Sequence, residues 1–213
     1  DAINSTSGLL TYEDNGGPNT YSQVWTGTTY NARSSMSSTP ADSRWFREVA
    51  SPKTGEKIVA LIDNDSSPVD PLYIFTWDGD DWGGGTPSVT IATLSTSADL
   101  TAPFDIAYEE LSGDVLFVYS NYSSNQLVYR RKPAGGAWPG SSSNAGTAYD
   151  VYKRWVRLEA QFGSDSILVG YLNNNERVGA MIWDGSSDTF GDQFADNAGT
   201  ATATSDERAF DIA

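Results

Sequence analysis

The chain has 213 residues, a length typical of one all-β domain and sufficient to bury a sizeable core. It contains neither Cys nor His, which excludes disulfides, thiolate metal sites and the serine- and cysteine-type catalytic triads in their usual forms. Its net charge is −15, from 28 acidic and 13 basic residues. Phosphate backbones and anionic lipids repel such a chain, so nucleic acid is not expected as a partner.

The sequence carries no segment for crossing a membrane, because no apolar run approaches the roughly 18 residues that a bilayer requires. No signal peptide is visible and the chain begins with Asp1 instead of Met, which predicts a processed mature protein or a segment of a longer one. Ser, Thr, Gly and Asn are abundant and Lys is scarce, as in many secreted and surface proteins. We therefore expect an extracellular or cell-surface location without membrane insertion.

Short runs rich in β-branched and aromatic residues recur along the whole chain, separated by turns rich in Gly, Asn, Asp and Ser. In chain order, the expected strands are 8–12 and one ending at 25, then 44–50, 57–62, 72–77 and 88–92, then 104–107 and 114–119, then 154–160, 166–171 and 177–183, and last 208–213. No segment shows a helical period. The pattern predicts an all-β chain.

A motif of a strand ending in Trp-x-Gly, followed by polar residues and an aromatic, recurs at regular intervals. The closing aromatics are Tyr30, Trp82, Trp138 and Phe190, so successive copies lie 52, 56 and 52 residues apart. The step from 190 through the end of the chain and back to 30 is 53 residues, and the four steps fill the chain. The third copy has Pro133 in place of the Trp, and the fourth is two residues longer.

Four repeats of about 53 residues that close at the chain ends predict a four-bladed β-propeller, a single domain over residues 1–213. The repeats are circularly permuted, and we expect the strand 208–213 to complete the blade that contains residues 8–30. The second strand of each repeat is almost wholly apolar, as expected for a strand covered on both faces by neighbouring blades. The alternative is a β-sandwich, which does not require its repeats to close.

Seven apolar residues of the repeats are candidates for the core between blades. They are Phe46, Phe104, Val156 and Phe210 on the first strands, and Trp25, Trp77 and Trp183 of the Trp-x-Gly motifs. We interpret both series as packing residues and not as ligand-binding aromatics. Arg-Trp-x-Arg at 44 and 154 alternates with Phe-Asp-Ile-Ala at 104 and 210, which indicates a duplicated unit of two blades.

The residues that follow the first apolar series are Arg47, Asp105, Arg157 and Asp211, with alternating sign. On the innermost strands of a propeller these side chains would converge on the axis. We predict a structural ring of ion pairs that neutralises the channel and orders the blades. A ligand site is the alternative.

Acidic clusters and potential glycan acceptors lie in the turns. Asp78, Asp80 and Asp81, Asp184 and Asp188, and Asp63, Asp65 and Asp70 could hold Ca²⁺, but they lack the spacing of a calcium loop, so we expect solvated turn carboxylates and neither a metal nor a cofactor. Asn-x-Ser/Thr tripeptides make Asn4, Asn64 and Asn121 candidate glycosylation sites. Glu48, Glu109, Glu110 and Glu159 could supply a carboxylate pair for glycoside hydrolysis, but nothing singles out two of them, so we do not expect an enzyme.

The blade pattern, Phe-Asp-Ile-Ala, a turn, an apolar strand and a strand ending in Trp-x-Gly, resembles the repeats of large microbial extracellular and cell-surface β-propeller proteins. This resemblance implies adhesion, surface display or assembly into extracellular fibres. We therefore expect a non-catalytic structural module of a surface filament or adhesin, whose partners are copies of itself, in head-to-tail assembly or tandem repeats. The alternatives are a carbohydrate-binding, lectin-like propeller and a sialidase-like glycoside hydrolase.

Overall fold

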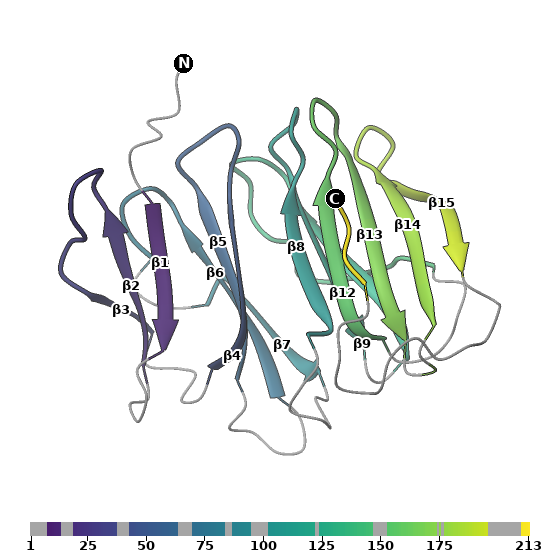
Figure 1. Ribbon diagram of the computed structural model, residues 1–213, viewed down its shortest axis with the longest axis horizontal. Coiled ribbons are helices and arrows are strands. Elements are labelled where there is room, and N and C mark those ends of the chain that lie inside the picture. Colours follow the sequence, from purple (N-terminus) through teal and green to yellow (C-terminus); the bar gives the residue numbers. More distant parts are fainter. Residues whose placement is uncertain are drawn as a thin grey trace. The chain divides into compact units, whose positions relative to one another are not determined.

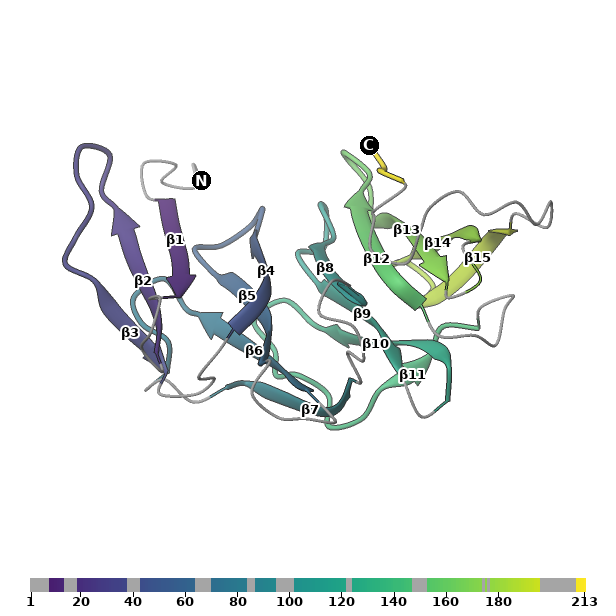
Figure 2. The ribbon, with the colours of Figure 1, turned by 60° about the horizontal axis from the view of Figure 1, so that its bottom comes forward.

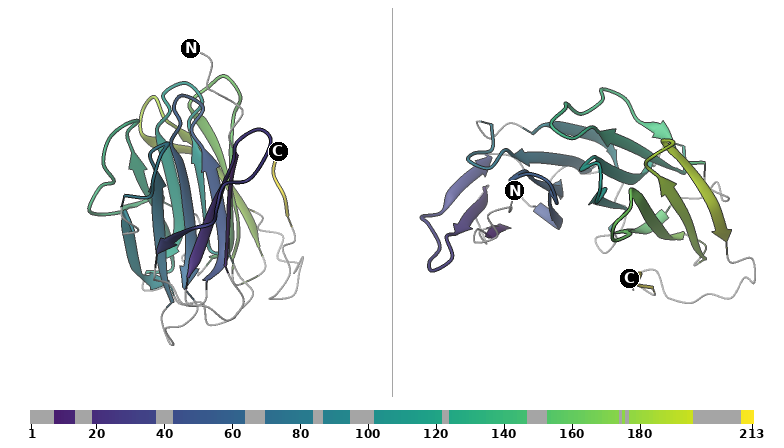
Figure 3. Two further views of the ribbon diagram at one scale, coloured as in Figure 1. Left: turned by 90° about the vertical axis from the view of Figure 1, so that its left-hand side faces the viewer. Right: turned by 90° about the horizontal axis from the view of Figure 1, so that it is seen from above.

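The computed structural model describes residues 8–13, 19–37, 43–63, 70–83, 87–94, 102–121, 124–146, 153–173, 175, 177–195 and 210–213. These residues form strands, turns and loops and contain no helix (Figure 3). The chain divides into two compact units, Asp1–Ser95 and Thr96–Ala213. Each unit holds two antiparallel sheets, which we call the first to fourth blades in chain order.

The first unit contains a three-stranded and a four-stranded blade (Figure 1). The first blade has the strand order β1 (Gly8–Glu13), β2 (Thr20–Trp25), β3 (Ser34–Ser37). The second has the order β4 (Ser43–Ala50), β5 (Lys57–Asp63), β6 (Asp70–Trp77), β7 (Val89–Leu94). Strands that follow one another in the sequence are neighbours in the sheet, which is the meander topology of a propeller blade.

The second unit contains two four-stranded blades with the same topology (Figure 2). The third blade has the strands β8 (Phe104–Tyr108), β9 (Val115–Asn121), β10 (Gln126–Lys132) and β11 (Ser143–Asn144). The fourth has the strands β12 (Lys153–Ala160), β13 (Ser166–Asn173), β14 (Val178–Asp184) and β15 (Thr189–Ala195). The innermost strands β4 and β12 share the Arg-Trp-x-Arg motif, and both carry a register shift at that motif.

Burial explains why the second strand of a repeat is apolar throughout. Nearly every residue of β5, β9 and β13 is buried, because each strand is central in its sheet and has side chains packed on both faces. β1 occupies the corresponding place in the first blade, yet its residues are half-buried or exposed. It lies at the edge of its sheet, and β2 is its one partner strand among the described residues.

Blades within a unit are joined by apolar clusters and specific hydrogen bonds. In the first unit, the indole Nε1 of Trp82 donates to Ser22 Oγ at 2.9 Å, and Thr11 Oγ1 donates to Glu48 Oε2 at 3.0 Å. In the second unit, the main-chain N–H of Val156 donates to the carbonyl of Ala102 at 3.1 Å. The apolar cluster of the second unit takes buried residues from β8, β9, β10, β12, β13 and β14, and Phe190 of β15 packs against it. Its largest buried member is Trp183.

The sequence prediction of an all-β fold built from four propeller-type blades is confirmed. Among residues 210–213 no strand is assigned, and residues 208 and 209 lie outside the described part of the chain. The C-terminal segment 210–213 lies beside the fourth blade (Figure 1). An added Cβ at Gly170 of β13 would come within 3.0 Å of the Phe210 side chain and 3.3 Å of the Ile212 side chain. Completion of the first blade by residues 208–213, and a single domain over 1–213, stay predictions.

Candidate functional site

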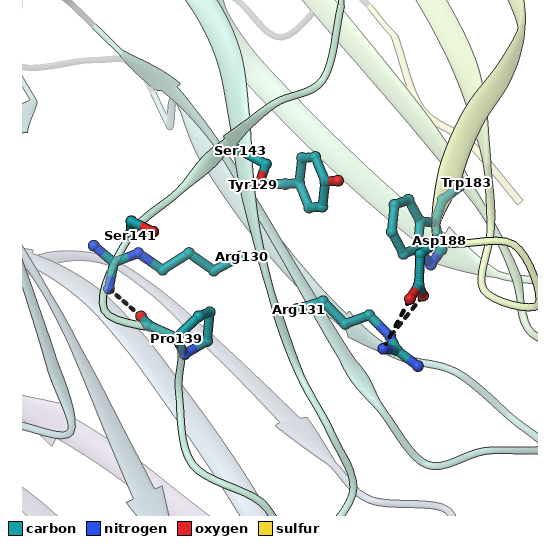
Figure 4. Close-up of a pocket in the computed structure, with 8 residues that line it drawn as sticks. All are labelled: Tyr129, Arg130, Arg131, Pro139, Ser141, Ser143, Trp183 and Asp188. Carbon is teal, nitrogen blue, oxygen red and sulfur yellow. Dashed lines mark hydrogen bonds and ion pairs between the residues drawn. The ribbon is translucent and has the colours of Figure 1, made fainter.

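A cleft of about 260 Å³ opens in the second unit, beside β10 of the third blade and the β14–β15 turn of the fourth (Figure 4). Its lining combines aromatic rings, two guanidinium groups, a carboxylate and hydroxyl groups. The lining residues are Tyr129, Arg130, Arg131, Pro139, Ser141, Ser143, Trp183 and Asp188. Residues that are about 50 positions apart in the sequence thus meet at one site.

Two aromatic rings, Tyr129 and Trp183, form the apolar wall of the cleft, and Phe190 packs against both of them. The ring centroids of Tyr129 and Trp183 are 5.1 Å apart, and Phe190 lies 5.2 Å from the first and 5.0 Å from the second. Trp183 is fully buried, whereas Tyr129 is half-buried. The Tyr129 hydroxyl makes no hydrogen bond to any described residue. Tyr129 can therefore offer both a ring and a hydroxyl to a ligand.

Arg131 of the third blade forms an ion pair with Asp188 of the fourth blade, and both residues line the cleft. Alternation along β10 places it on the same face as Tyr129. Its Nε lies 3.1 Å from Asp188 Oδ1, and its Nη1 donates to Asp188 Oδ2 at 3.2 Å (Figure 4). It also forms an ion pair with Asp114, and its Nε lies 4.0 Å from Glu109 Oε1. Three carboxylates thus surround this one guanidinium.

Glu109 is the fully buried carboxyl behind the aromatic wall. Trp183 Nε1 donates to its Oε1 at 2.7 Å and Ser112 Oγ donates to its Oε2 at 2.6 Å. Burial raises the pKa of Glu109 above its ordinary value of 4.5, and these two hydrogen bonds and Arg131 only partly oppose that effect. Gly185 lies directly on the carboxyl group, so any side chain there would displace it.

Arg130 points to the other side of β10 and has neutral partners. Its Nε donates to Ser142 Oγ and its Nη1 to the carbonyl of Pro139, both at 3.0 Å. Among the described residues, no carboxylate pairs with this guanidinium. Ser141 and Ser143 flank Ser142, and both are exposed at the mouth of the cleft.

The structure brings together one pair of the predicted charge ring. Arg157 Nη1 lies 3.7 Å from Asp105 Oδ2, and the Asp105 side chain is fully buried. The Asp105 carboxylate also accepts hydrogen bonds from the main-chain N–H groups of Ile106 at 2.8 Å and Leu158 at 2.9 Å. Arg47 of the first unit is half-buried, and Asp211 of the second unit is exposed. A ring of all four residues stays a prediction.

The seven predicted core residues differ in burial. Phe104, Val156 and Trp183 are buried, with 3% exposure or less. Phe46, Trp25, Trp77 and Phe210 are half-buried. Trp183 also lines the cleft, so one residue that the sequence assigned to packing alone belongs to the candidate site as well.

The Asp carboxylates of the acidic turns accept hydrogen bonds from main-chain N–H groups of the same turn. Asp78 Oδ1 accepts from the N–H groups of Asp80 and Asp81, and Asp184 Oδ1 accepts from Ser186 N and Oγ. These hydrogen bonds lower the pKa of both Asp78 and Asp184. No group of three acidic residues that could hold a metal occurs in the described part of the chain.

The remaining predicted residues are dispersed. Asp63 is buried at the end of β5, and burial raises the pKa of Glu48 in the first unit. Glu110 is half-buried and Glu159 is exposed on β12. Asn121 ends β9, whereas Asn4, Asn64 and Asp65 and the side chain of Asp70 lie outside the described residues. Of the four Glu residues from which a hydrolytic pair could be drawn, Glu109 lies behind the aromatic wall of the cleft, where it accepts a hydrogen bond from Trp183.

Sequence reasoning missed Tyr129, Arg130 and Arg131. The available signal was the run Tyr129-Arg130-Arg131-Lys132, which holds three of the 13 basic residues of a strongly acidic chain. The third repeat also lacks the Trp of the Trp-x-Gly motif. Tyr129 of that repeat packs instead on the Trp of the next one, Trp183.

Comparisons with solved structures show likenesses of fold. A mutant of AofleA from Arthrobotrys oligospora aligns with 91% of the chain and 55% of its own length, at 11% identity and a TM-score of 0.48. The intramolecular trans-sialidase from Ruminococcus gnavus, in complex with oseltamivir carboxylate, aligns with 84% of the chain and 41% of its own length, at 16% identity and a TM-score of 0.43. A leech intramolecular trans-sialidase aligns with 84% of the chain and 30% of its own length, at 17% identity and a TM-score of 0.43. No residue role is carried over from these proteins.

The chain spans 55% or less of the length of these three structures. No protein-family model matches it, and no curated protein matches it in sequence. None of the described residues belongs to a helix that is long and apolar enough to cross a membrane.

Proposed function

We propose that this chain is a non-catalytic, extracellular propeller module that binds carbohydrate in the cleft of its second unit. The carrying observation is the half-buried Tyr129 ring, which is backed by Trp183 and Phe190 and bordered by the Arg131–Asp188 ion pair and the exposed serines. A sugar ring has apolar C–H faces and a rim of hydroxyl groups. An aromatic wall with a few convergent polar groups is complementary to both.

The size of the cleft supports a small ligand. Pockets for small molecules commonly measure about 300–1,000 Å³, and this cleft is slightly smaller, at about 260 Å³. We therefore assign it to one sugar ring, with the rest of any longer glycan lying outside.

The state of the carboxylates supports binding without hydrolysis. Glycosidases need two carboxyl groups that reach the scissile bond from opposite sides. Here Asp188 is engaged by Arg131, and the buried Glu109 is held by Trp183 and Ser112, with no surface that a substrate could reach. We expect no release of product from fluorogenic glycosides that bind in the cleft; turnover at a rate that depends on Asp188 would contradict this part of the proposal.

A glycan array followed by calorimetry tests the proposal. We expect Tyr129→Ala to weaken binding of the selected sugars about tenfold, since aromatic contacts contribute about 0.5–1.5 kcal/mol beyond their buried area. The matched control is Phe162→Ala, which removes an aromatic ring that is 93% exposed in the same unit and lies outside the cleft. Absence of any glycan binding, or equal binding by the Tyr129→Ala variant and the wild type, would refute the proposal.

Assembly with copies of itself is a second candidate function, favoured by β1, which has one partner strand among the described residues. Exposed strand edges pair readily with strands of other chains. We expect sedimentation velocity to show a concentration-dependent increase in mass. Replacing Leu10, which is 44% exposed on β1, with Lys should reduce that increase. A monomer at all concentrations would exclude this role.

A further inference from the structure

We propose that copies of this chain bind head to tail, with the Phe162 ring of one copy inserted into an aromatic pocket on the first unit of the next copy. This inference rests on the second candidate function, self-assembly, and names the joint between copies. It is carried by two complementary features of one chain, an exposed aromatic ring on the second unit and an open aromatic pocket on the first.

The pocket lies on the first blade and measures about 340 Å³. Gly8 and Leu9 of β1, Trp25 at the end of β2, and Tyr30 line it. The ring centroids of Trp25 and Tyr30 are 5.1 Å apart, and a β-bridge joins the two residues. Tyr30 is 51% exposed, and none of the described residues that line the pocket is charged. The pocket therefore suits an apolar occupant.

The second blade contains an equivalent aromatic pair that a neighbouring blade covers. The ring centroids of Trp77 and Trp82 are 5.2 Å apart. Trp82 is only 5% exposed, and its indole donates to Ser22 of the first blade. In this repeat the pair is thus closed by a partner from another blade.

The fourth blade shows which kind of group such a pair accepts. Trp183 and Phe190 receive a third ring, Tyr129 of the third blade, at centroid distances of 5.1 and 5.2 Å. No third ring among the described residues lies against the pair of Trp25 and Tyr30. Aromatic rings favour tilted contacts at these distances. The occupant that completes the first-blade pair in the same way is an aromatic ring.

Phe162 in the β12–β13 turn presents such a ring to solvent. It is 93% exposed, more than any other large hydrophobic residue in the described part of the chain. Its turn is held in place, because the N–H of Gln161 donates to the carbonyl of Ser166 at 2.9 Å. Asp165 Oδ1 also accepts from the N–H of Leu111, in the β8–β9 turn, at 2.9 Å. A ring on a fixed turn loses little conformational entropy when it binds.

Charge favours this contact over others between copies. Each chain carries a net charge of −15, so two copies repel each other. The tip of the knob, residues 161–164, and the turn beside the pocket, residues 26–29, contain no charged residue. The knob and the pocket are different surfaces, so one copy can use both at once. Such heterologous contacts build chains or rings.

Sedimentation velocity on the full chain tests the joint from both sides. Phe162→Ser should weaken self-association by about tenfold or more, because burial of an aromatic side chain contributes strongly to an interface. The matched control is Phe194→Ser, which removes a ring that is 59% exposed on β15 of the same unit. It should associate like the wild type.

Gly8→Leu blocks the pocket and keeps both of its rings. An added Cβ at Gly8 meets Trp25 at an ordinary contact distance of 3.5 Å, so the rest of the side chain can occupy the pocket. We expect the same loss of self-association as in Phe162→Ser. Melting temperatures close to that of the wild type show that both variants are folded.

Mixing the two variants distinguishes a head-to-tail joint from other contacts. The Phe162→Ser chain keeps its pocket, and the Gly8→Leu chain keeps its knob. An equimolar mixture should therefore form pairs that neither variant forms alone. Growth should stop at two copies, because the remaining pocket and the remaining knob site of each pair are disabled.

The outcomes separate this inference from the proposed functions. Self-association that survives Phe162→Ser and Gly8→Leu, or a mixture of the two variants that stays monomeric, overturns the joint and leaves assembly through β1 intact. A wild-type chain that is monomeric at all concentrations overturns both the joint and self-assembly. Carbohydrate binding is judged separately, by the response to Tyr129→Ala.

Discussion

Asp105 holds the two blades of the second unit together at the level of a single side chain. Its fully buried carboxylate accepts two main-chain N–H groups, one of them from Leu158 on the neighbouring blade, and faces Arg157. The Arg157 side chain is 23% exposed, so solvent screens part of the ion pair. The hydrogen bonds to the charged group therefore carry most of the stabilisation.

We expect Asp105→Asn to lower the free energy of unfolding by about 2–3 kcal/mol, because one carboxylate oxygen is replaced by an amide donor that faces another N–H group. Urea denaturation measures the loss. Glu159→Gln, an exposed carboxylate on β12, is the control and should stay within about 0.5 kcal/mol of the wild type. A loss no larger than that of the control would show that Asp105 does not join the blades.

Protonation of the buried Glu109 should make the free energy of unfolding depend on pH. Its pKa is raised by burial, so the folded chain holds the proton more tightly than the unfolded chain. The free energy of unfolding should then fall as the pH rises from about 4.5 through the pKa of the folded state. Glu109→Gln cannot titrate and should show a smaller fall over the same interval.

The low-pH range serves as an internal control for that measurement. The lowered pKa values of Asp78 and Asp184 act only below their ordinary value of 3.8, where their contribution is lost on acidification. Wild type and Glu109→Gln should behave alike there. Parallel stability curves above pH 4.5 would rule out the buried carboxyl as the origin of the pH dependence.

At the scale of elements, the β13–β14 pair depends on a glycine beneath an aromatic ring. Gly179 lies opposite Tyr171 in the register, and a Cβ at this position would overlap the Tyr171 ring. Tyr171 is 1% exposed and cannot move aside without disturbing the core of the second unit. A glycine in a strand interior often marks such a close approach.

Gly179→Ala should lower the free energy of unfolding by about 1–3 kcal/mol through overpacking. Gly191→Ala on the exposed strand β15 is the matched control, because an added Cβ there meets no atom within 4 Å. It should be neutral within about 0.5 kcal/mol. Melting temperatures of the two variants check the difference, and equal values would show that the Tyr171 ring adapts freely.

At the scale of the whole molecule, the first blade differs from the others in having three strands among the described residues instead of four. The other three blades each have one more strand before the strand that corresponds to β1. The repeat pattern predicts that residues 208–213 supply it. Phe210 and Ile212 pack on Gly170 of the fourth blade, so this segment contributes to the stability of its own unit in any case.

Deletion of residues 208–213 should lower the melting temperature and cause self-association, because an apolar face of β13 and the edge of β1 are left uncovered. Light scattering and calorimetry measure the two effects. Phe194→Ser, which removes a ring that is 59% exposed on β15, is the control and should cause neither. A truncated chain that stays monomeric with an unchanged melting temperature would disprove closure of the first blade by this segment.

The long strands could be read from the sequence because their signal is local. The expected strands 57–62, 72–77 and 154–160 correspond to β5, β6 and β12 within two residues at each end. The bounds of the outer strands β3, β11 and β15 could not be predicted from the sequence, since these strands have exposed residues and few apolar ones. Repeat number and blade topology follow from the same local periodicity.

The sequence by itself thus determined an acidic, all-β chain of four blades without Cys or His chemistry. Only the tertiary structure decided which side chains meet: Tyr129 with Trp183, Arg131 with Asp188, and Asp105 with Leu158. Each of these pairs is separated by more than 50 residues. Strand periodicity predicts the face on which a residue lies but not its neighbour on the next blade, because that neighbour depends on the turns and on how the two blades pack.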